Sequence, residues 1–226
     1  MAREKRFSAA AAHELRTPVA ELRTLLEVAA SRPRSVEESA RTIATAVASV
    51  ERLDRLVGAM LRLLRIESGR EEVTPAPVPL REMIDECIES VRAIADARGI
   101  RFAVDVTRDL PAGVCLQADE GLLRLALRNL VANAAEYADD RTQVTITVSR
   151  EGTDAVVRIA NAAAISGADA ARIGEPLWRP DQARANSEHL GLGLTLAGAA
   201  ARAMGARLDV GFHAGEVVVE VRGRVQ

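Results

Sequence analysis

The sequence has few aromatic residues, few cysteines and no long apolar run. Aromatic residues make up 2% of the 226 residues and hydrophobic residues 48%, so the core must be built mainly from Ala, Val, Leu and Ile. Cys87 and Cys115 are too few and too scattered for a disulfide framework or a zinc site, which favours a reducing, intracellular compartment. No apolar run reaches the roughly 20 residues that a membrane-spanning helix needs.

The sequence also lacks an excess of charge of either sign. Its 30 Lys and Arg residues nearly balance its 32 Asp and Glu residues, which gives a net charge of −2. A chain without a basic field does not attract the phosphates of a nucleic acid. We therefore expect no direct binding to DNA or RNA.

The first part of the sequence has the pattern of a helical hairpin. Small and apolar residues recur with heptad spacing over residues 12–29, and a broader apolar stripe covers residues 43–64. Pro33 interrupts the pattern, and Ser35 with Glu38 has the spacing of a capping box that begins the second helix. One hairpin cannot cover two such stripes, so we expect a homodimer in which two hairpins form a four-helix bundle.

A different architecture is expected after Gly69. The proline-rich stretch VTPAPVP indicates an extended linker at residues 70–79, after a first domain at residues 1–69. In the remaining domain, residues 80–226, helical patterns alternate with short β-branched runs of period two. We expect helices at 80–98, 119–138 and 192–204, and strands at 100–106, 114–117, 143–150, 155–161, 206–212 and 216–223. The fold class is therefore α+β: a helical hairpin followed by an α/β sandwich whose mixed sheet is covered by helices on one face.

The first helix carries a histidine in the sequence HELRTP. A neutral imidazole can attack a phosphoryl group through one ring nitrogen, and a carboxylate that accepts the other ring N–H makes the attacking nitrogen more basic. Glu14 follows His13 directly, and Thr17 lies one turn further on. The threonine hydroxyl can hold a water molecule for the reverse direction, in which a phosphoryl group is removed by hydrolysis. On its own the pattern also fits an ordinary exposed histidine.

Two further patterns favour the binding of phosphate groups. Asn129 and Asn133 lie four residues apart and so project from one helix face, where amide oxygens suit Mg²⁺ and amide N–H groups can donate to phosphate oxygens. Gly191 and Gly193 precede a helix, and glycines there let backbone N–H groups approach an anion. Each pattern alone also fits a plain helix or a tight turn.

Taken in order, HELRTP, LRLALRNLVANAAEYADD, PLWRPD and SEHLGLGL resemble the motifs of the sensor histidine kinases of two-component systems, over nearly the full chain. The resemblance implies that His13 is the phosphoacceptor and that Glu14 is its general base. It implies that Thr17 aids dephosphorylation of a partner response regulator, whose receiver domain supplies an aspartate.

The same resemblance implies an ATP-binding domain of the GHKL type. Asn133 would coordinate Mg²⁺ between the nucleotide phosphates, and Asn129 and Tyr137 would line the pocket. Trp178 would pack a lid from which Arg179 reaches the terminal phosphate. The residues expected at the nucleotide are Asn129, Asn133, Tyr137, Asn161, Arg179, Gly191 and Gly193.

The sequence departs from the family pattern at three places. ANAAAI, residues 160–165, stands where the family usually has Asp-Asn-Gly-x-Gly-Ile, so Ala160 occupies the place of the aspartate that binds the adenine amino group. Losing such a hydrogen bond costs about 1–3 kcal/mol, unless the Asn161 amide, a water or a main-chain carbonyl replaces it. Glu136 stands where many members have a lysine, and His189 where a glycine is usual.

We interpret the chain as the cytoplasmic core of a sensor histidine kinase that autophosphorylates on His13 with ATP and Mg²⁺. It would touch a membrane only through segments outside this sequence. One alternative is a phosphotransfer or phosphatase module, or a pseudokinase scaffold, with an impaired nucleotide pocket. Another is a non-catalytic helical dimerisation protein.

Overall fold

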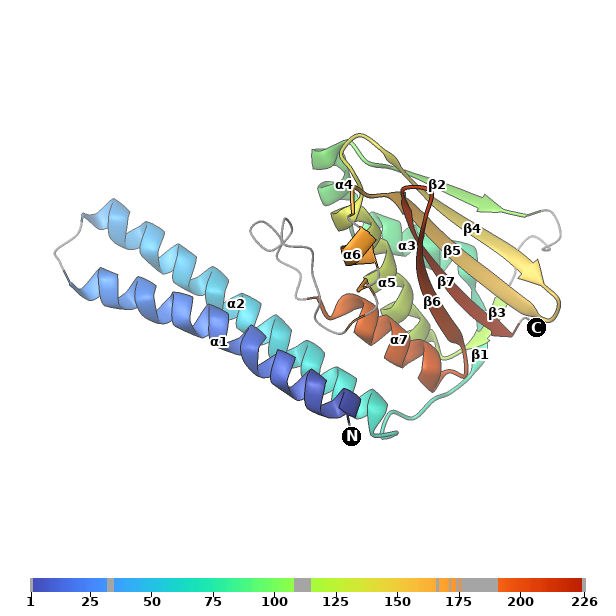
Figure 1. Cartoon of the computed structure of the whole chain (residues 1–226), viewed down its shortest axis with the longest axis horizontal. Helices are drawn as coiled ribbons and strands as arrows, with labels where there is room; N and C mark the ends of the chain where they lie inside the picture. The colour runs from blue at the N-terminus through green and yellow to red at the C-terminus, as the bar shows by residue number, and fades with distance from the viewer. Residues whose placement is uncertain are drawn as a thin grey trace. The chain divides into compact units, whose positions relative to one another are not determined.

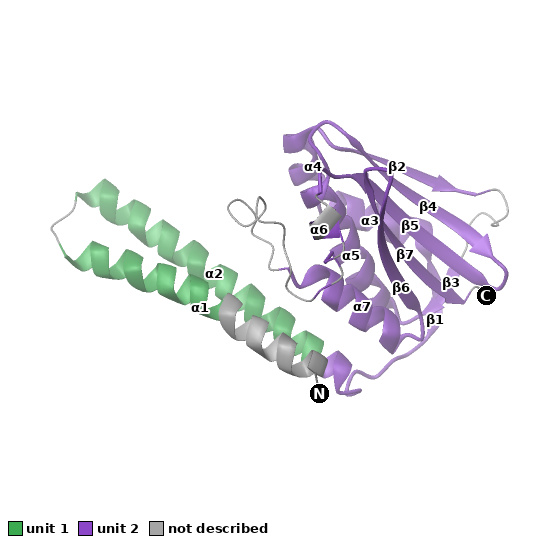
Figure 2. Cartoon of the chain, viewed as in Figure 1, with its two compact units in different colours: residues 1–64 green, residues 65–226 purple. Residues whose placement is uncertain are grey.

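The computed structural model describes residues 2–31, 35–107, 115–165, 167–170, 172–173, 175 and 191–224; the side chains of residues 2–14, 167 and 168 lie outside this description. The chain divides into two compact units, Met1–Leu64 and Arg65–Gln226 (Figure 2). In the part of the chain that the structure describes, no helix combines the length and the apolarity needed to cross a bilayer.

The first unit is a helical hairpin. Helix α1 (Ala2–Ala30) and helix α2 (Val36–Glu67) run side by side (Figure 1), and α2 continues a few residues into the second unit. The predicted capping box begins α2: the Glu38 N–H donates to Ser35 Oγ at 3.1 Å, and the Ser35 N–H donates to Glu38 Oε2 at 3.2 Å. The hairpin prediction is thus confirmed, while Pro33 lies outside the described residues.

The second unit is built on a mixed sheet. Among the described residues this sheet has five strands in the order β2-β4-β5-β7-β6, of which only β2 and β4 are parallel neighbours. Their bounds are β2 (Arg101–Val106), β4 (Gln143–Glu151), β5 (Asp154–Ala162), β6 (Arg207–His213) and β7 (Glu216–Arg224). The predicted mixed sheet is confirmed, and each strand lies within one or two residues of its expected range.

Helices cover one face of this sheet, as Figure 1 shows. They are α3 (Leu80–Glu89), α4 (Arg92–Arg98), α5 (Glu120–Tyr137), α6 (Gly167–Ala170) and α7 (Gly193–Ala203). Their apolar side chains pack on alternate strand residues, of which Val144, Ile146 and Val148 are fully buried. The core of the second unit therefore lies between the helices and this one face.

Two details differ from the sequence expectations. The helix expected at 80–98 is broken into α3 and α4, because Val91 leaves the helical region with φ −115° and ψ 5°. The segment expected to be a linker contains a strand, β1 (Ala76–Pro79), which pairs antiparallel with β3 (Cys115–Ala118). Proline is tolerated there because the pair is two-stranded and leaves one edge of β1 free of ladder bonds.

Both cysteines, Cys87 and Cys115, are free thiols. Cys87 lies on the buried face of α3, and this burial raises the pKa of its thiol to about 11. The thiol therefore stays protonated near neutral pH and acts as a small apolar side chain.

Candidate functional site

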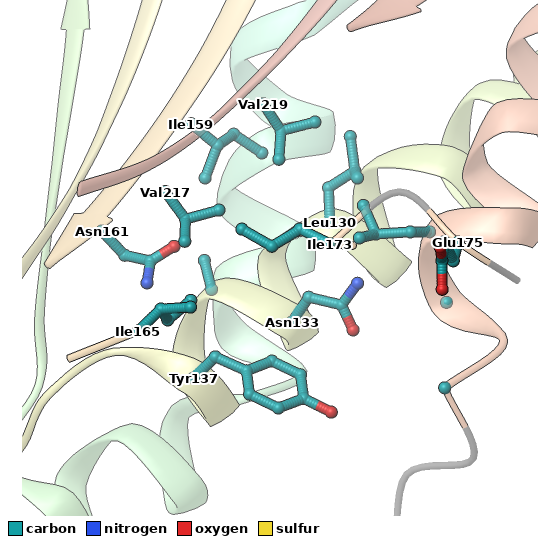
Figure 3. Close-up of a pocket in the computed structure, with 14 residues that line it drawn as sticks. Leu130, Asn133, Tyr137, Ile159, Asn161, Ile165, Ile173, Glu175, Val217 and Val219 are labelled. Carbon is teal, nitrogen blue, oxygen red and sulfur yellow. The ribbon is translucent and has the colours of Figure 1, made fainter. Parts of the chain in front are cut away.

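A recess opens between α5, the start of α7 and strands β5 and β7 (Figure 3). Its lining is mostly apolar with a few polar groups, which is the usual composition of a small-molecule site. Its described lining consists of Leu130, Asn133, Ala134, Tyr137, Ile159, Asn161, Ile165, Ile173, Glu175, Gly191, Gly193, Leu194, Val217 and Val219. Five of the residues predicted at the nucleotide, Asn133, Tyr137, Asn161, Gly191 and Gly193, are thus brought together.

The strand register decides which residues of β5 face this recess. Asn161 pairs with Val144 of β4 and with Val217 of β7, and the next pair on the same face contains Ile159. Since directly paired residues share a face, this is the face that the helices cover. Figure 3 shows the side chains of Ile159 and Asn161 pointing into the recess.

Ala160 belongs to the opposite face of the sheet. It pairs with Thr145 and Val218, and its same-face neighbour Arg158 forms an ion pair with Glu220 at 3.8 Å. The sequence analysis placed Ala160 at the base-contacting position, and the structure corrects this placement. The residue of this strand end that faces the recess with a polar group is Asn161, one position later.

The alanines that follow Asn161 are accommodated without backbone strain. In the described residues, positive φ at non-glycine positions occurs at Arg141 and Ala214, and therefore not at Ala162, Ala163 or Ala164. The methyl groups that replace the usual glycines thus do not force a left-handed conformation here.

Asn129 and Asn133 meet the N-terminal turn of α7. A Cβ atom built on Gly193 would lie 2.8 Å from Asn133 Oδ1 and 3.3 Å from Asn129 Oδ1. Only a residue without a side chain lets α7 come this close to both amides. Asn129 is also held by its own helix, because its Nδ2 donates to the carbonyl of Leu125 at 2.7 Å. Asn129 therefore borders the site without lining the recess itself.

Gly191 and the start of α7 form the rim beside these amides. Gly191 has φ +67°, a left-handed conformation that glycine adopts without steric cost. Leu192 is buried and its carbonyl begins the helix by accepting from the Leu196 N–H at 2.8 Å. The first N–H groups of α7 thus lie at the Asn133 end of the recess, where a helix N-terminus favours anions.

The C-terminal end of α5 carries Tyr137 and is anchored by an arginine that sequence reasoning missed. Arg98 donates to the carbonyls of Ala135 at 2.9 Å and Ala138 at 2.7 Å, and to the carbonyl of Glu136. These are carbonyls that the end of a helix leaves without intrahelical partners. No sequence pattern linked Arg98 to a helix end about 40 residues away.

On the hairpin, the predicted phosphoacceptor lies inside α1. Helix α1 continues through HELRTP, and Pro18 is buried within it. The side chains of His13 and Glu14 lie outside the described residues. Thr17 is exposed and borders a shallow groove on α1 together with Arg16, Ala20, Glu21, Thr24, Leu25 and Val28.

Three other sequence expectations fall outside the described residues: Trp178, Arg179 and His189. Conversely, the sequence analysis did not name the apolar lining, namely Leu130, Ile159, Ile165, Ile173, Val217 and Val219. For the strand residues among them, the period-two alternation was the signal that could have found them. Glu175 also lines the rim, paired with Arg172 at 3.1 Å.

Comparison with known proteins gives two family matches along the chain. Residues 3–69 match the His Kinase A (phospho-acceptor) domain, and residues 118–223 match the Histidine kinase-, DNA gyrase B-, and HSP90-like ATPase family. The structure of Acinetobacter baumannii histidine kinase AdeS has a similar fold, with a TM-score of 0.75 and 16% identity over 95% of this chain and 98% of that one.

Relatives among curated proteins are similar along nearly the whole chain. The probable sensor protein PcoS of Escherichia coli is 31% identical over 96% of this chain and 46% of its own length. Sensor protein CutS of Streptomyces coelicolor is 34% identical over 91% of this chain and 49% of its own length. The chain thus spans about half the length of these relatives. With both domain matches in the order that the sequence motifs indicated, the chain belongs to the sensor histidine kinases of two-component systems.

Proposed function

We propose that this chain is the ATP-dependent catalytic core of a protein histidine kinase, which phosphorylates itself on His13. The carrying observation is the recess of the second unit, where Asn133, Gly193 and Asn161 meet around an apolar interior. Its Asn133 end offers amide groups and helix N–H groups to phosphates, and its apolar end suits a nucleobase. The recess therefore supports nucleotide binding more than a scaffold with an impaired pocket.

In the proposed reaction, a ring nitrogen of His13 attacks the γ-phosphorus of ATP. The bond from that phosphorus to the β,γ-bridging oxygen breaks, ADP leaves, and a nitrogen–phosphorus bond forms. Glu14 accepts the ring proton from the other nitrogen, which leaves a neutral phosphoimidazole. In a second step the phosphoryl group passes to an aspartate carboxylate of a response-regulator receiver domain.

Asn133 suits a magnesium ion, because its neutral amide oxygen is a hard ligand that lies beside the α7 N-terminus. When bound between ATP and Asn133, the ion would neutralise part of the phosphate charge. Tyr137 and Asn129 would border the nucleotide, and Arg179 would reach its terminal phosphate, as in the family pattern. Because ATP is held in the cytoplasm, the activity requires that this part of the protein be cytoplasmic.

The hairpin supports the proposal of a homodimer. Its described surface exposes large apolar side chains on both helices, among them Leu26, Ile43 and Leu64 with exposed fractions of 51%, 63% and 53%. A second copy would cover them in a four-helix bundle. A solved relative, histidine kinase ThkA, is recorded in complex with a response regulator protein; its TM-score is 0.74 at 20% identity. We propose a receiver domain as the partner of this chain as well.

The test is incubation of the purified chain with ATP labelled on the γ-phosphorus. Wild type should acquire label that is stable in base and lost in acid, as expected of a phosphoramidate. His13→Gln should acquire none while still binding ADP in calorimetric titration, because His13 lies in the other unit from the recess. Label on His13→Gln equal to that of wild type would refute the assignment of His13.

A second measurement concerns Thr17. With a phosphorylated receiver domain as substrate, Thr17→Ala should slow dephosphorylation while autophosphorylation stays near the wild-type rate. Equal dephosphorylation rates for Thr17→Ala and wild type would remove Thr17 from the mechanism.

A further inference from the structure

Asn161 is a buried amide in the apolar end of the recess. Its exposed fraction is 4%, and among the described residues no other polar or charged residue is buried to this degree. Around it lie the aliphatic side chains of Ile159, Val217 and Ile165 (Figure 3). A buried amide in such surroundings is costly unless its hydrogen-bonding groups find partners.

Among the described residues, this amide has one weak hydrogen-bond partner. Asn161 Nδ2 donates to the carbonyl of Ala162 at 3.4 Å, which is longer than the usual 2.7–3.2 Å of an N–H···O bond. The same carbonyl already accepts from the Asp139 N–H at 2.9 Å. Turning the amide by 180° would give up this weak bond and bring Oδ1 toward the Ala162 carbonyl oxygen, while the loop would keep its anchor to Asp139.

The two ends of the recess fix the direction in which a nucleotide lies. Phosphates belong at the Asn133 and Gly193 end, near the α7 N-terminus. The base then lies between the aliphatic side chains and presents its edge to Asn161. In the present orientation Nδ2 donates to the Ala162 carbonyl, so Oδ1 is the atom that can accept a hydrogen bond from a ligand.

An amide and a carboxylate read a purine edge differently. A carboxylate only accepts hydrogen bonds, so it suits the 6-amino group of adenine and repels the 6-carbonyl oxygen of hypoxanthine or guanine. An amide accepts through Oδ1 and donates through Nδ2, so it can pair with a 6-amino group in one orientation and a 6-oxo group in the other.

We propose that Asn161 reads the 6-position of a purine nucleotide through its neutral, reversible amide, and that the site therefore binds 6-oxopurine nucleotides nearly as well as adenine nucleotides. This inference rests on the proposed function in one respect, namely that the recess is the nucleotide site. It goes beyond that function by naming a second class of ligand.

The probes are ADP and inosine diphosphate (IDP), which differ only at the N1–C6 edge of the base. Calorimetric titration of the full chain with each, in the presence of Mg²⁺ at pH 8, gives two dissociation constants for one preparation. Their ratio does not depend on how much of the preparation is folded. For wild type we expect ADP to bind at most about tenfold more tightly than IDP, since turning the amide costs a weak hydrogen bond and a contact of two oxygen atoms that are not in close approach.

The deciding variant is Asn161→Asp, with Ala160→Ser as its matched control. The aspartate keeps the acceptor for ADP but places a carboxylate against the oxo group of IDP, so the preference for ADP should widen by a further tenfold or more. Ala160→Ser adds a polar group one residue earlier on the other face of the sheet, and should leave the ratio at its wild-type value. Asn161→Leu should weaken ADP and IDP to a similar extent.

The outcomes separate this inference from the function on which it rests. ADP binding with a ratio that Asn161→Asp leaves unchanged would overturn the role of Asn161 and leave the nucleotide site standing. A change of ratio in Ala160→Ser as large as that in Asn161→Asp would also overturn it. If wild type binds neither nucleotide, both the inference and the proposed nucleotide site are wrong.

Discussion

The two units of this chain differ in how many of their large apolar side chains are exposed. In the hairpin, exposed large apolar residues recur along both helices, from Val19 in α1 to Leu64 in α2. In the described part of the second unit, Ile94 is the one large apolar side chain that is exposed, with an exposed fraction of 42%. The hairpin buries some apolar side chains, such as Leu56 and Leu63, but it leaves many others exposed.

This difference indicates that the two units have different functions. A unit with a completed core can hold a ligand recess of fixed shape, as the close packing of Gly193 on Asn133 shows. A hairpin with an open apolar surface is completed by another molecule, so its state depends on association. The nucleotide site should therefore survive changes that take the dimer apart, whereas the phosphoacceptor helix should be affected by them.

The largest effect should come from charging the open surface of the hairpin. Ile43→Asp combined with Val47→Asp places carboxylates at two residues that are 63% and 51% exposed in one copy. Burying such charges against a second copy costs several kcal/mol, so dimer affinity should fall at least about a thousandfold. Sedimentation equilibrium measures this as a change from the dimer mass to that of the single chain.

Ile94→Asp is the matched control, since it charges the exposed apolar residue of the other unit. It should leave the dimer mass unchanged, and the double hairpin variant should still bind ADP. A hairpin variant that remains dimeric would show that the dimer uses another surface.

The next largest effect is expected at the nucleotide recess of the second unit. Gly193→Ala adds a methyl group 2.8 Å from Asn133 Oδ1 and 3.1 Å from Asn133 Nδ2, so the amide must move. The displaced amide would lose the phosphate or magnesium contact that we propose for it, which should weaken nucleotide binding by about 10- to 100-fold at about 1.4 kcal/mol per decade. Calorimetric titration with ADP, with and without Mg²⁺, measures the loss.

Gly198→Ala controls for the effect of a methyl group in the same helix. Its nearest neighbour outside the helix backbone is Arg202 Nη1 at 3.4 Å, an ordinary contact at the end of a flexible side chain. This variant should bind ADP as wild type does. Similar losses in both variants would mean that helix α7 as a whole, and not the Asn133 amide, responds to substitution.

Much of the fold could be predicted because local patterns decided it. The period-two runs located each strand of the sheet, since a half-buried strand needs apolar residues at every second position. Ser35 and Glu38 form the predicted capping box, with both reciprocal hydrogen bonds. The spacing of Asn129 and Asn133 placed both amides on one face, where α7 meets them.

The Asn161 end of the recess was not placed correctly in the same way. Matching letters to a family motif assigned the position to Ala160, but a strand alternates its faces, and a shift of one residue exchanges the two sides. The pairing of Asn161 with Val144 and Val217 shows which side faces the recess. The alternation of Ile159 with the charged Arg158 was the sequence signal that could have placed Asn161 on this side.

The smallest effect concerns a contact that no local pattern indicated. Arg98, the last residue of α4, joins this helix to the end of α5 by donating to three main-chain carbonyls and to Asp140 at 2.8 Å. Arg98→Met keeps much of the apolar stem but removes every donor, so the free energy of unfolding of the second unit should fall by about 1–3 kcal/mol. Urea unfolding followed by circular dichroism measures this change.

Arg92→Met provides the contrast, because Arg92 makes an exposed i,i+3 ion pair with Glu89 at 2.6 Å. Exposed pairs on a helix contribute only about 0.3–0.5 kcal/mol, since water screens them and both side chains lose freedom. A loss in Arg98→Met no larger than that in Arg92→Met would show that water replaces the arginine at the helix end. A larger loss would mean that Tyr137, one residue before the carbonyl of Ala138, owes its place to a side chain from a distant part of the sequence.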